Sequence, residues 1–102
     1  MDRHVSEHRE ALAELCRRHY VRRLELFGSA ARGTFDVETS DLDFLVEFED
    51  LAPALYAEHY FDLLHAFEDL FARPIDLLPA RSIRNPYLAE EIARDRTLLY
   101  AA

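Results

Sequence analysis

Two stretches decide the fold: LELFGSAARG at residues 24–33 and SDLDFLVEF at residues 40–48. In the second stretch, Asp41 and Asp43 stand two residues apart at the head of an apolar run. Residues i and i+2 of a strand point to the same face, about 6.5–7 Å apart. Two ionised carboxylates at that distance repel by roughly 2–2.5 kcal/mol at an effective dielectric constant of about 20. The pair therefore predicts a hard divalent cation, Mg²⁺ above all, held by oxygen ligands.

The first stretch predicts a phosphate site beside the carboxylate pair. Its apolar alternation ends at Gly28, and a short helix over Ser29–Arg32 is expected to follow. The free N–H groups of that helix and the Ser29 hydroxyl suit phosphate oxygens, although Ser29 is also a good helix cap. The spacing from Gly28 to Gly33 matches a Walker A loop, but Thr34 follows it and the chain contains no lysine. Metal-dependent nucleotide chemistry is the first hypothesis.

The complete string resembles the signature of the DNA polymerase beta-like nucleotidyltransferase superfamily. Within that superfamily it is most similar to the minimal nucleotidyltransferase (MNT) domain, written G-S-x-x-R-G, a short gap, and S-D-x-D followed by hydrophobic residues. The resemblance covers nearly the whole chain and extends to the strand Ile75-Asp76-Leu77. It implies that Asp76 is the third carboxylate of a catalytic and metal-binding set with Asp41 and Asp43. The nucleotide-binding candidates are Gly28, Ser29, Arg32 and Ser40.

Composition indicates one compact domain over residues 1–102. Half of the residues are apolar and 31% are charged, as in globular proteins. The net charge of −8 argues against direct nucleic-acid binding, which needs basic surface. The N-terminus is polar and no apolar run is long enough to span a membrane. The single cysteine, Cys16, suits a reducing cytoplasm and is expected to be a small buried residue.

We expect an α/β (α+β) fold in which a small mixed sheet carries the three aspartates on one face and helices pack on the other. The predicted helices are residues 3–19, Ser29–Arg32, 53–72 and one within 81–95. The predicted strands are residues 21–27, 41–48, 74–78 and 97–100.

Several polar residues have two interpretations. Arg32 suits a phosphate, or it holds the loop at residues 34–39 through Asp36 or Glu38. His4 and His8 have a metal-ligand spacing, but no third ligand is evident, so exposed helical histidines are the preferred interpretation. We expect His59 and His65 at the surface. The roles of Arg81, Arg84 and Tyr87 stay open.

The resemblance also implies a mechanism with two Mg²⁺ ions and ATP as the substrate. Asp41 and Asp43 hold the ion that grips the triphosphate, and Asp76 with the pair holds a second ion near the attacking hydroxyl. Larger relatives carry an extra domain for the acceptor, and this chain is too short for one. Small MNT proteins are typically encoded beside a HEPN-domain ribonuclease toxin and transfer AMP to one of its tyrosines.

The expected function is therefore a type VII-like antitoxin that is a Mg²⁺-dependent protein adenylyltransferase, with a cognate HEPN toxin as its partner. Two alternatives stay open. One is an idle enzyme that neutralises the toxin by complex formation alone. The other is nucleotidyl transfer to a small molecule.

Overall fold

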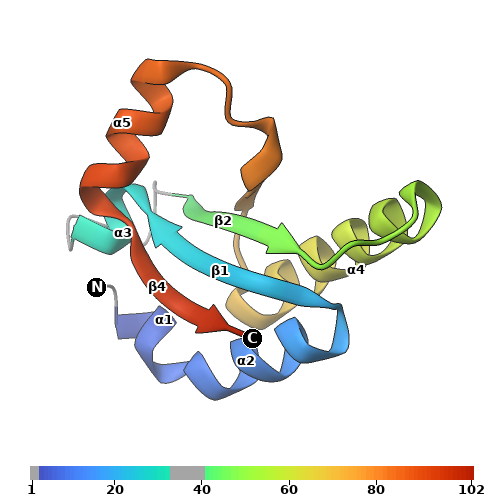
Figure 1. The fold of residues 1–102 in the computed structure, drawn as a ribbon. Helices are drawn as coiled ribbons and strands as arrows, with labels where there is room; N and C mark the ends of the chain where they lie inside the picture. The colour runs from blue at the N-terminus through green and yellow to red at the C-terminus, as the bar shows by residue number, and fades with distance from the viewer. Residues whose placement is uncertain (1–2, 33–40) are drawn as a thin grey trace.

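A computed structural model describes residues 3–32 and 41–102, and in it a four-stranded sheet runs through the centre of the molecule (Figure 1). The strand order is β3-β2-β1-β4. Strand β1 is antiparallel to both β2 and β4, whereas β2 and β3 are parallel. Parallel neighbours need a long crossover, which α4 supplies. The elements are α1 (Arg3–Glu7), α2 (Arg9–Arg18), β1 (Val21–Phe27), α3 (Gly28–Arg32), β2 (Leu42–Phe48), α4 (Pro53–Phe71), β3 (Ile75–Pro79), the 3-10 helix η1 (Ala80–Ser82), α5 (Pro86–Asp95) and β4 (Thr97–Ala101).

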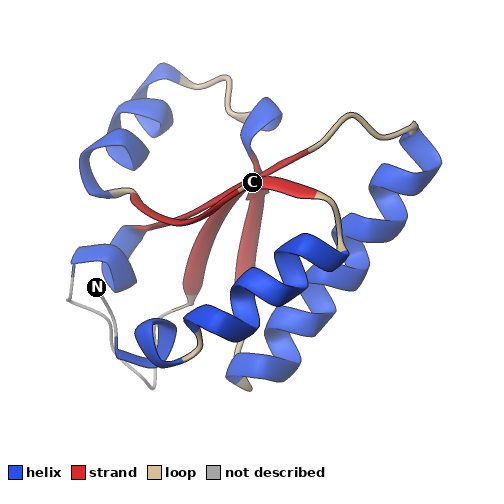
Figure 2. Cartoon of the chain, turned by 60° about the horizontal axis from the view of Figure 1, so that its bottom comes forward, coloured by secondary structure: helices blue, strands red, loops and turns tan. Residues whose placement is uncertain are grey.

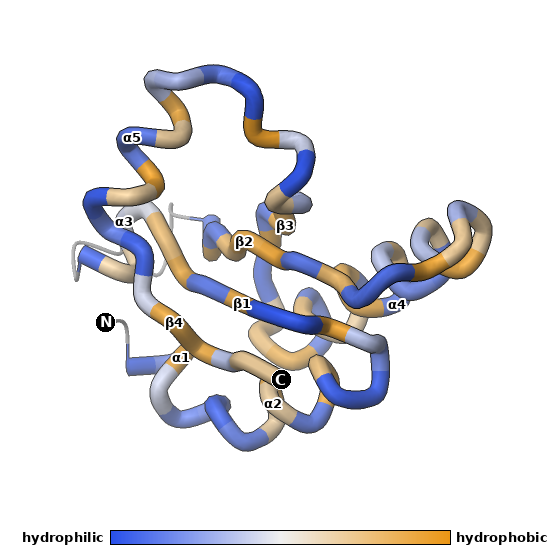
Figure 3. The backbone as a smooth tube through the Cα atoms, viewed as in Figure 1, coloured by the Kyte–Doolittle hydropathy of each residue, from blue (hydrophilic) through white to orange (hydrophobic). Residues whose placement is uncertain are grey.

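One face of the sheet packs into the hydrophobic core. Burial alternates strictly along β2, as in a half-buried strand, whereas β1 has two exposed residues followed by four buried ones. Both strands carry hydrophobic and hydrophilic residues (Figure 3). On β2 every second side chain is buried against the helices, and the ring of Phe44 lies 5.2 Å from that of Phe67 on α4. The fully buried side chains with the largest volumes are Phe44, Phe67, Leu12, Leu24, Leu26, Leu42, Leu63, Val5, Val21, Val46 and Cys16.

Helices α2 and α4 form the expected helical layer on the core face (Figure 2). Helix α5 lies on the opposite side of the sheet, beside α3. Its residue Ile92 is buried and lines a cavity with Leu45, which alternates away from the core on β2. The mixed α/β fold is confirmed, with the addition that α5 covers part of the face that carries the aspartates.

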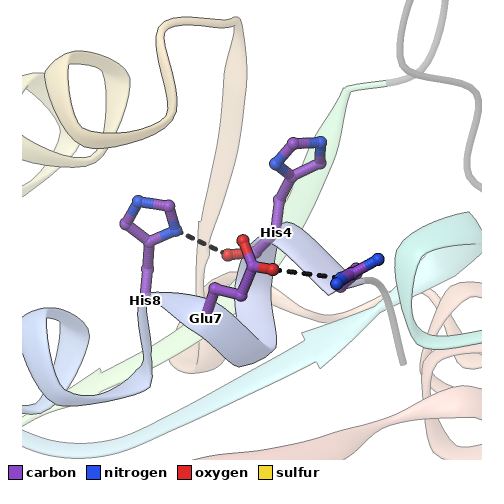
Figure 4. A network of polar contacts seen from close by, with 4 residues as sticks. His4, Glu7 and His8 are labelled. Atoms are coloured by element: carbon purple, nitrogen blue, oxygen red, sulfur yellow. Dashed lines mark hydrogen bonds and ion pairs between the residues drawn. The ribbon is translucent and has the colours of Figure 1, made fainter.

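The first predicted helix, residues 3–19, is interrupted at His8, which separates α1 from α2. The Nδ1 atom of His8 lies 2.7 Å from the carbonyl oxygen of His4, and the neighbouring Glu7 carboxylate pairs with Arg3 at 3.0 Å (Figure 4). A ring nitrogen of His8 is therefore engaged with the backbone. No group of three or more His, Cys, Asp or Glu side chains in the described ranges has the arrangement of a metal site.

His65 is exposed as expected, whereas His59 is only partly exposed. His59 is half-buried against His19, with 3.1 Å between their Nδ1 atoms, and its ring also packs edge-on against Tyr20. Burial and the neighbouring His59 lower the pKa of His19. This cluster forms because the end of α2 packs against α4, a contact that the spacing of one helix does not reveal.

Cys16 is buried, as predicted, and burial raises the pKa of its thiol to about 12. The thiol therefore stays protonated at neutral pH and is a packing group rather than a nucleophile. Among the described helices, none combines the length and hydrophobicity needed to cross a bilayer.

Candidate active site

Strands β2 and β3 bring two of the three predicted aspartates side by side. Asp43 pairs with Asp76 in the parallel register, and the next pair along is Phe44 with Leu77. Cross-strand partners project to the same face of a sheet. Because Phe44 and Leu77 are buried in the core, Asp43 and Asp76 point away from it. Asp41 precedes β2 by one residue and is exposed at the same end of the strand.

The electrostatics of Asp43 show that the aspartates interact. The pKa of Asp43 is raised to about 6, chiefly by burial, and then by the charges of Asp76 and Asp41 and by a hydrogen bond with the Asp76 carboxyl group. The positive charge of Arg32 acts in the opposite direction. Asp43 is thus a carboxyl group whose ionised form is disfavoured by its surroundings.

This donor set suits a magnesium ion that is bound together with a substrate. It consists of carboxylate oxygens alone, and a cation would relieve their mutual repulsion. Mg²⁺ is usually held by one or two carboxylates and completes its shell with waters and substrate phosphates. Asp43 and Asp76 supply such a pair, and Asp41 is close enough for its charge to raise the pKa of Asp43. Within the described ranges the three carboxylates do not form a ready-made three-ligand group, so waters and substrate phosphates would complete the shell of the ion.

Gly28 brings the backbone close to the same carboxylates. Its φ angle is +70°, a conformation that favours glycine, and a Cβ atom at this position would collide with Asp43 Oδ2. Strand β1 ends at Phe27 and α3 begins at Gly28, and the next residue, Ser29, lines the same cavity as Asp43. Glycine is required at this turn for two reasons, the backbone angle and the space.

A cleft of about 210 Å³ lies between this turn and α5. Gly28, Ser29, Arg32 and Asp43 line one side. The opposite side is formed by α5, through Leu88, Glu91 and Ile92. Sequence reasoning missed these three residues, because the apolar pair has the spacing of an ordinary core-facing stripe and Glu91 has the appearance of a solvated charge.

Arg32 is held by a residue far along the chain. Its Nη1 atom lies 2.7 Å from Asp95 Oδ2, so the last residue of α3 is joined to the last residue of α5. The partners suggested by the sequence, Asp36 and Glu38, lie outside the described residues, as do Gly33 and the nucleotide-binding candidate Ser40.

Residues 8–99 match the sequence profile of the family described as the nucleotidyltransferase domain. The chain belongs to this nucleotidyltransferase family. It is 34% identical over 91 residues to a Methanocaldococcus jannaschii protein named as a candidate protein adenylyltransferase, covering 89% of this chain and 86% of the relative. The solved structure of a candidate minimal nucleotidyltransferase superposes with a TM-score of 0.76 at 37% identity and 95% coverage of both chains.

This chain also superposes on a solved structure from a complex of a tri-AMPylated Shewanella oneidensis HEPN toxin with an MNT antitoxin. The TM-score is 0.60 at 20% identity, with 95% of this chain and 72% of the other covered. At this identity the likeness establishes a shared fold. The match to the family therefore rests on the sequence profile and on the more similar relatives.

Replacing Gly28 with Ala should destabilise this nucleotidyltransferase by about 1–3 kcal/mol, because an L-residue in the left-handed region costs about 1–2 kcal/mol before any collision. Chemical denaturation measures this change in the free energy of unfolding. In an Asp43→Ala background the collision is absent, so the penalty should shrink to the backbone part. A penalty that is the same in both backgrounds would show that Gly28 and Asp43 do not approach each other.

Proposed function

We propose that this chain is a Mg²⁺-dependent protein adenylyltransferase that acts as an antitoxin and transfers AMP from ATP to a tyrosine of a HEPN ribonuclease toxin. The observation that carries the chemistry is the in-register pair Asp43 and Asp76 beside the Gly28 turn. The identity to a relative named as a candidate protein adenylyltransferase supports a protein acceptor. The fold shared with an MNT antitoxin supports the toxin as that acceptor.

In the proposed site, the turn at Gly28 binds the phosphates of the nucleotide and the aspartates bind the metal ions. Asp41 and Asp43 would hold one Mg²⁺ with the triphosphate, and Asp76 with this pair would hold a second. When bound, the metal neutralises phosphate charge and lowers the pKa of the attacking hydroxyl. The missing side chain at Gly28 lets the turn lie against Asp43. The Ser29 hydroxyl would donate a hydrogen bond to a phosphate oxygen.

Asp76 is the proposed proton acceptor. It is exposed on β3, which is an edge strand of the sheet, so a side chain of a partner protein has open access to it. The tyrosine oxygen forms a bond to the α-phosphorus, the bond from that phosphorus to pyrophosphate breaks, and the tyrosine proton passes to a carboxylate oxygen of Asp76. Asp43 is half-buried between Asp41 and Asp76, so it is better placed to bind a metal ion than to contact a protein acceptor.

Mass spectrometry tests the proposal directly. The chain is incubated with the HEPN-domain protein of its own genome, ATP and Mg²⁺, and the toxin mass is expected to rise by one or more AMP units. Omitting Mg²⁺ should abolish the change. An unchanged mass with the toxin still inhibited would instead support neutralisation by complex formation.

Growth rescue separates the same two functions in cells. If transfer is the mechanism, the double variant Asp41→Asn/Asp43→Asn should no longer rescue cells that express the toxin. Full rescue by this variant would contradict the enzymatic proposal. Transfer of AMP to an aminoglycoside in the absence of a protein partner, detected by mass spectrometry, would point to a small-molecule acceptor.

A further inference from the structure

The end of α5 is fastened to the rest of the fold by two consecutive residues. Asp95 contacts Arg32 of α3 at 2.7 Å, and its side chain is only 21% exposed. The next residue, Arg96, lies 3.4 Å from Oε2 of Glu25, a carboxylate buried on the central strand β1 and also paired with Arg23 at 2.9 Å. The two contacts differ in location, since only the first one reaches the cleft.

The Arg32 contact lies at the cleft itself. Arg32 lines it together with Ser29 and Asp43, and its charge opposes the rise in the pKa of Asp43. A guanidinium carries five N–H donors in a fixed fork. The contact with Asp95 uses Nη1, so donors remain for a second, anionic partner on the cleft side.

We propose that Asp95 is a positioning residue, which holds the guanidinium of Arg32 at the cleft so that it receives a phosphate group of the nucleotide. The inference rests on the proposed function in one respect, namely that the nucleotide phosphates occupy this cleft. A long arginine side chain has many rotamers, and an anchor at one edge removes most of them before the ligand arrives. Asp95 thereby strengthens binding without contacting the nucleotide.

A purely structural role for Asp95 would be to keep α5 in place. The adjacent Arg96–Glu25 contact already joins the same helix end to the central strand. Ile92, one turn earlier, is buried as well. The position of α5 therefore has supports that are independent of Asp95, whereas the Asp95 contact is the one that reaches Arg32.

The test measures binding of α,β-methylene-ATP with Mg²⁺ by calorimetry, because the carbon bridge in this analogue replaces the bond that transfer breaks. Asp95→Asn should weaken binding about two- to tenfold, the usual effect of leaving one flexible side chain to be ordered by the ligand. Arg32→Gln should weaken it more, about tenfold to a hundredfold, because a charged donor to the phosphate is lost. Asp95→Glu should recover most of the affinity.

Melting temperatures of the same variants test whether Asp95 acts only by keeping α5 in place. Both Asp95→Asn and Arg32→Gln remove the same ion pair, so their melting temperatures should fall by similar amounts. Asp95→Asn should weaken binding no further when it is added to Arg32→Gln. The control Glu14→Gln, which removes the exposed Arg17–Glu14 pair at 2.9 Å on α2, should leave binding unchanged.

Equal losses of affinity in Asp95→Asn and Arg32→Gln would overturn the inference, because both changes would then act through helix packing. Wild-type affinity in Asp95→Asn would also overturn it while leaving the proposed function intact. If the wild-type protein fails to bind the analogue with Mg²⁺, the proposed function itself fails and the inference falls with it.

Discussion

Replacing Asp43 with Asn should reduce AMP transfer by about a thousandfold or more and yet make the metal-free protein more stable at pH 8. The loss of activity follows because metal coordination supplies several kcal/mol of transition-state stabilisation, and about 1.4 kcal/mol corresponds to a factor of ten in rate. The gain in stability follows because Asn removes a charge that burial and two neighbouring carboxylates disfavour.

The pH dependence of that stability has a definite sign. The pKa of Asp43 is raised from 3.8 to about 6 in the folded protein, so the folded state binds this proton more readily than the unfolded chain does. The loss of folding stability that the ionised Asp43 causes in the wild-type protein is therefore complete above about pH 6. It is relieved as the pH falls toward 4. The stability difference between Asp43→Asn and wild type should be largest at pH 7–8 and should shrink below about pH 4.

Thermal unfolding in EDTA across pH 4–8 measures this difference. Adding Mg²⁺ and ATP should reverse the order, because ligand binding stabilises only the protein that binds it. Glu49→Gln, at an exposed carboxylate just beyond β2, serves as the control and should change neither activity nor stability. If Asp43→Asn is less stable than wild type at pH 8 in EDTA, burial and the neighbouring carboxylates do not disfavour the ionised form of Asp43.

Replacing Asp76 with Asn should impair transfer about a hundredfold or more while leaving binding of α,β-methylene-ATP within about threefold of wild type. A positioned general base contributes typically about 10²–10⁴ to the rate. Asp76 is exposed, so its removal should not disturb the fold. Single-turnover transfer to the toxin and calorimetry of the analogue measure the two quantities separately.

The same variant has a spectroscopic signature. Because the charge of Asp76 raises the pKa of Asp43, Asp76→Asn should lower that pKa toward its ordinary value, as followed by NMR titration of the Asp43 carboxyl carbon. Asp69→Asn, an exposed aspartate on α4, should leave both transfer and the pKa of Asp43 unchanged. Loss of analogue binding with intact turnover of bound ATP would show that the role given to Asp76 is wrong.

Much of the fold could be predicted from local patterns. The strands and helices lie within a few residues of their predicted bounds, and the main exception is the break at His8. The alternation on β2 already separates Leu42, Phe44 and Val46 from Asp43, because side-chain direction in a strand depends on sequence spacing alone. The requirement for glycine at residue 28 is also local, since it comes from a turn between a strand and a helix.

The sequence by itself therefore determined the elements, the buried face of the sheet and the proximity of Asp41 to Asp43, because each depends on residues close together in the chain. The tertiary structure alone decided that Asp76 pairs with Asp43, that α5 forms the far wall of the cleft, and that Asp95 holds Arg32. These contacts join segments separated by a helix or more. Their geometry depends on strand register and helix packing, which no spacing within a single segment encodes.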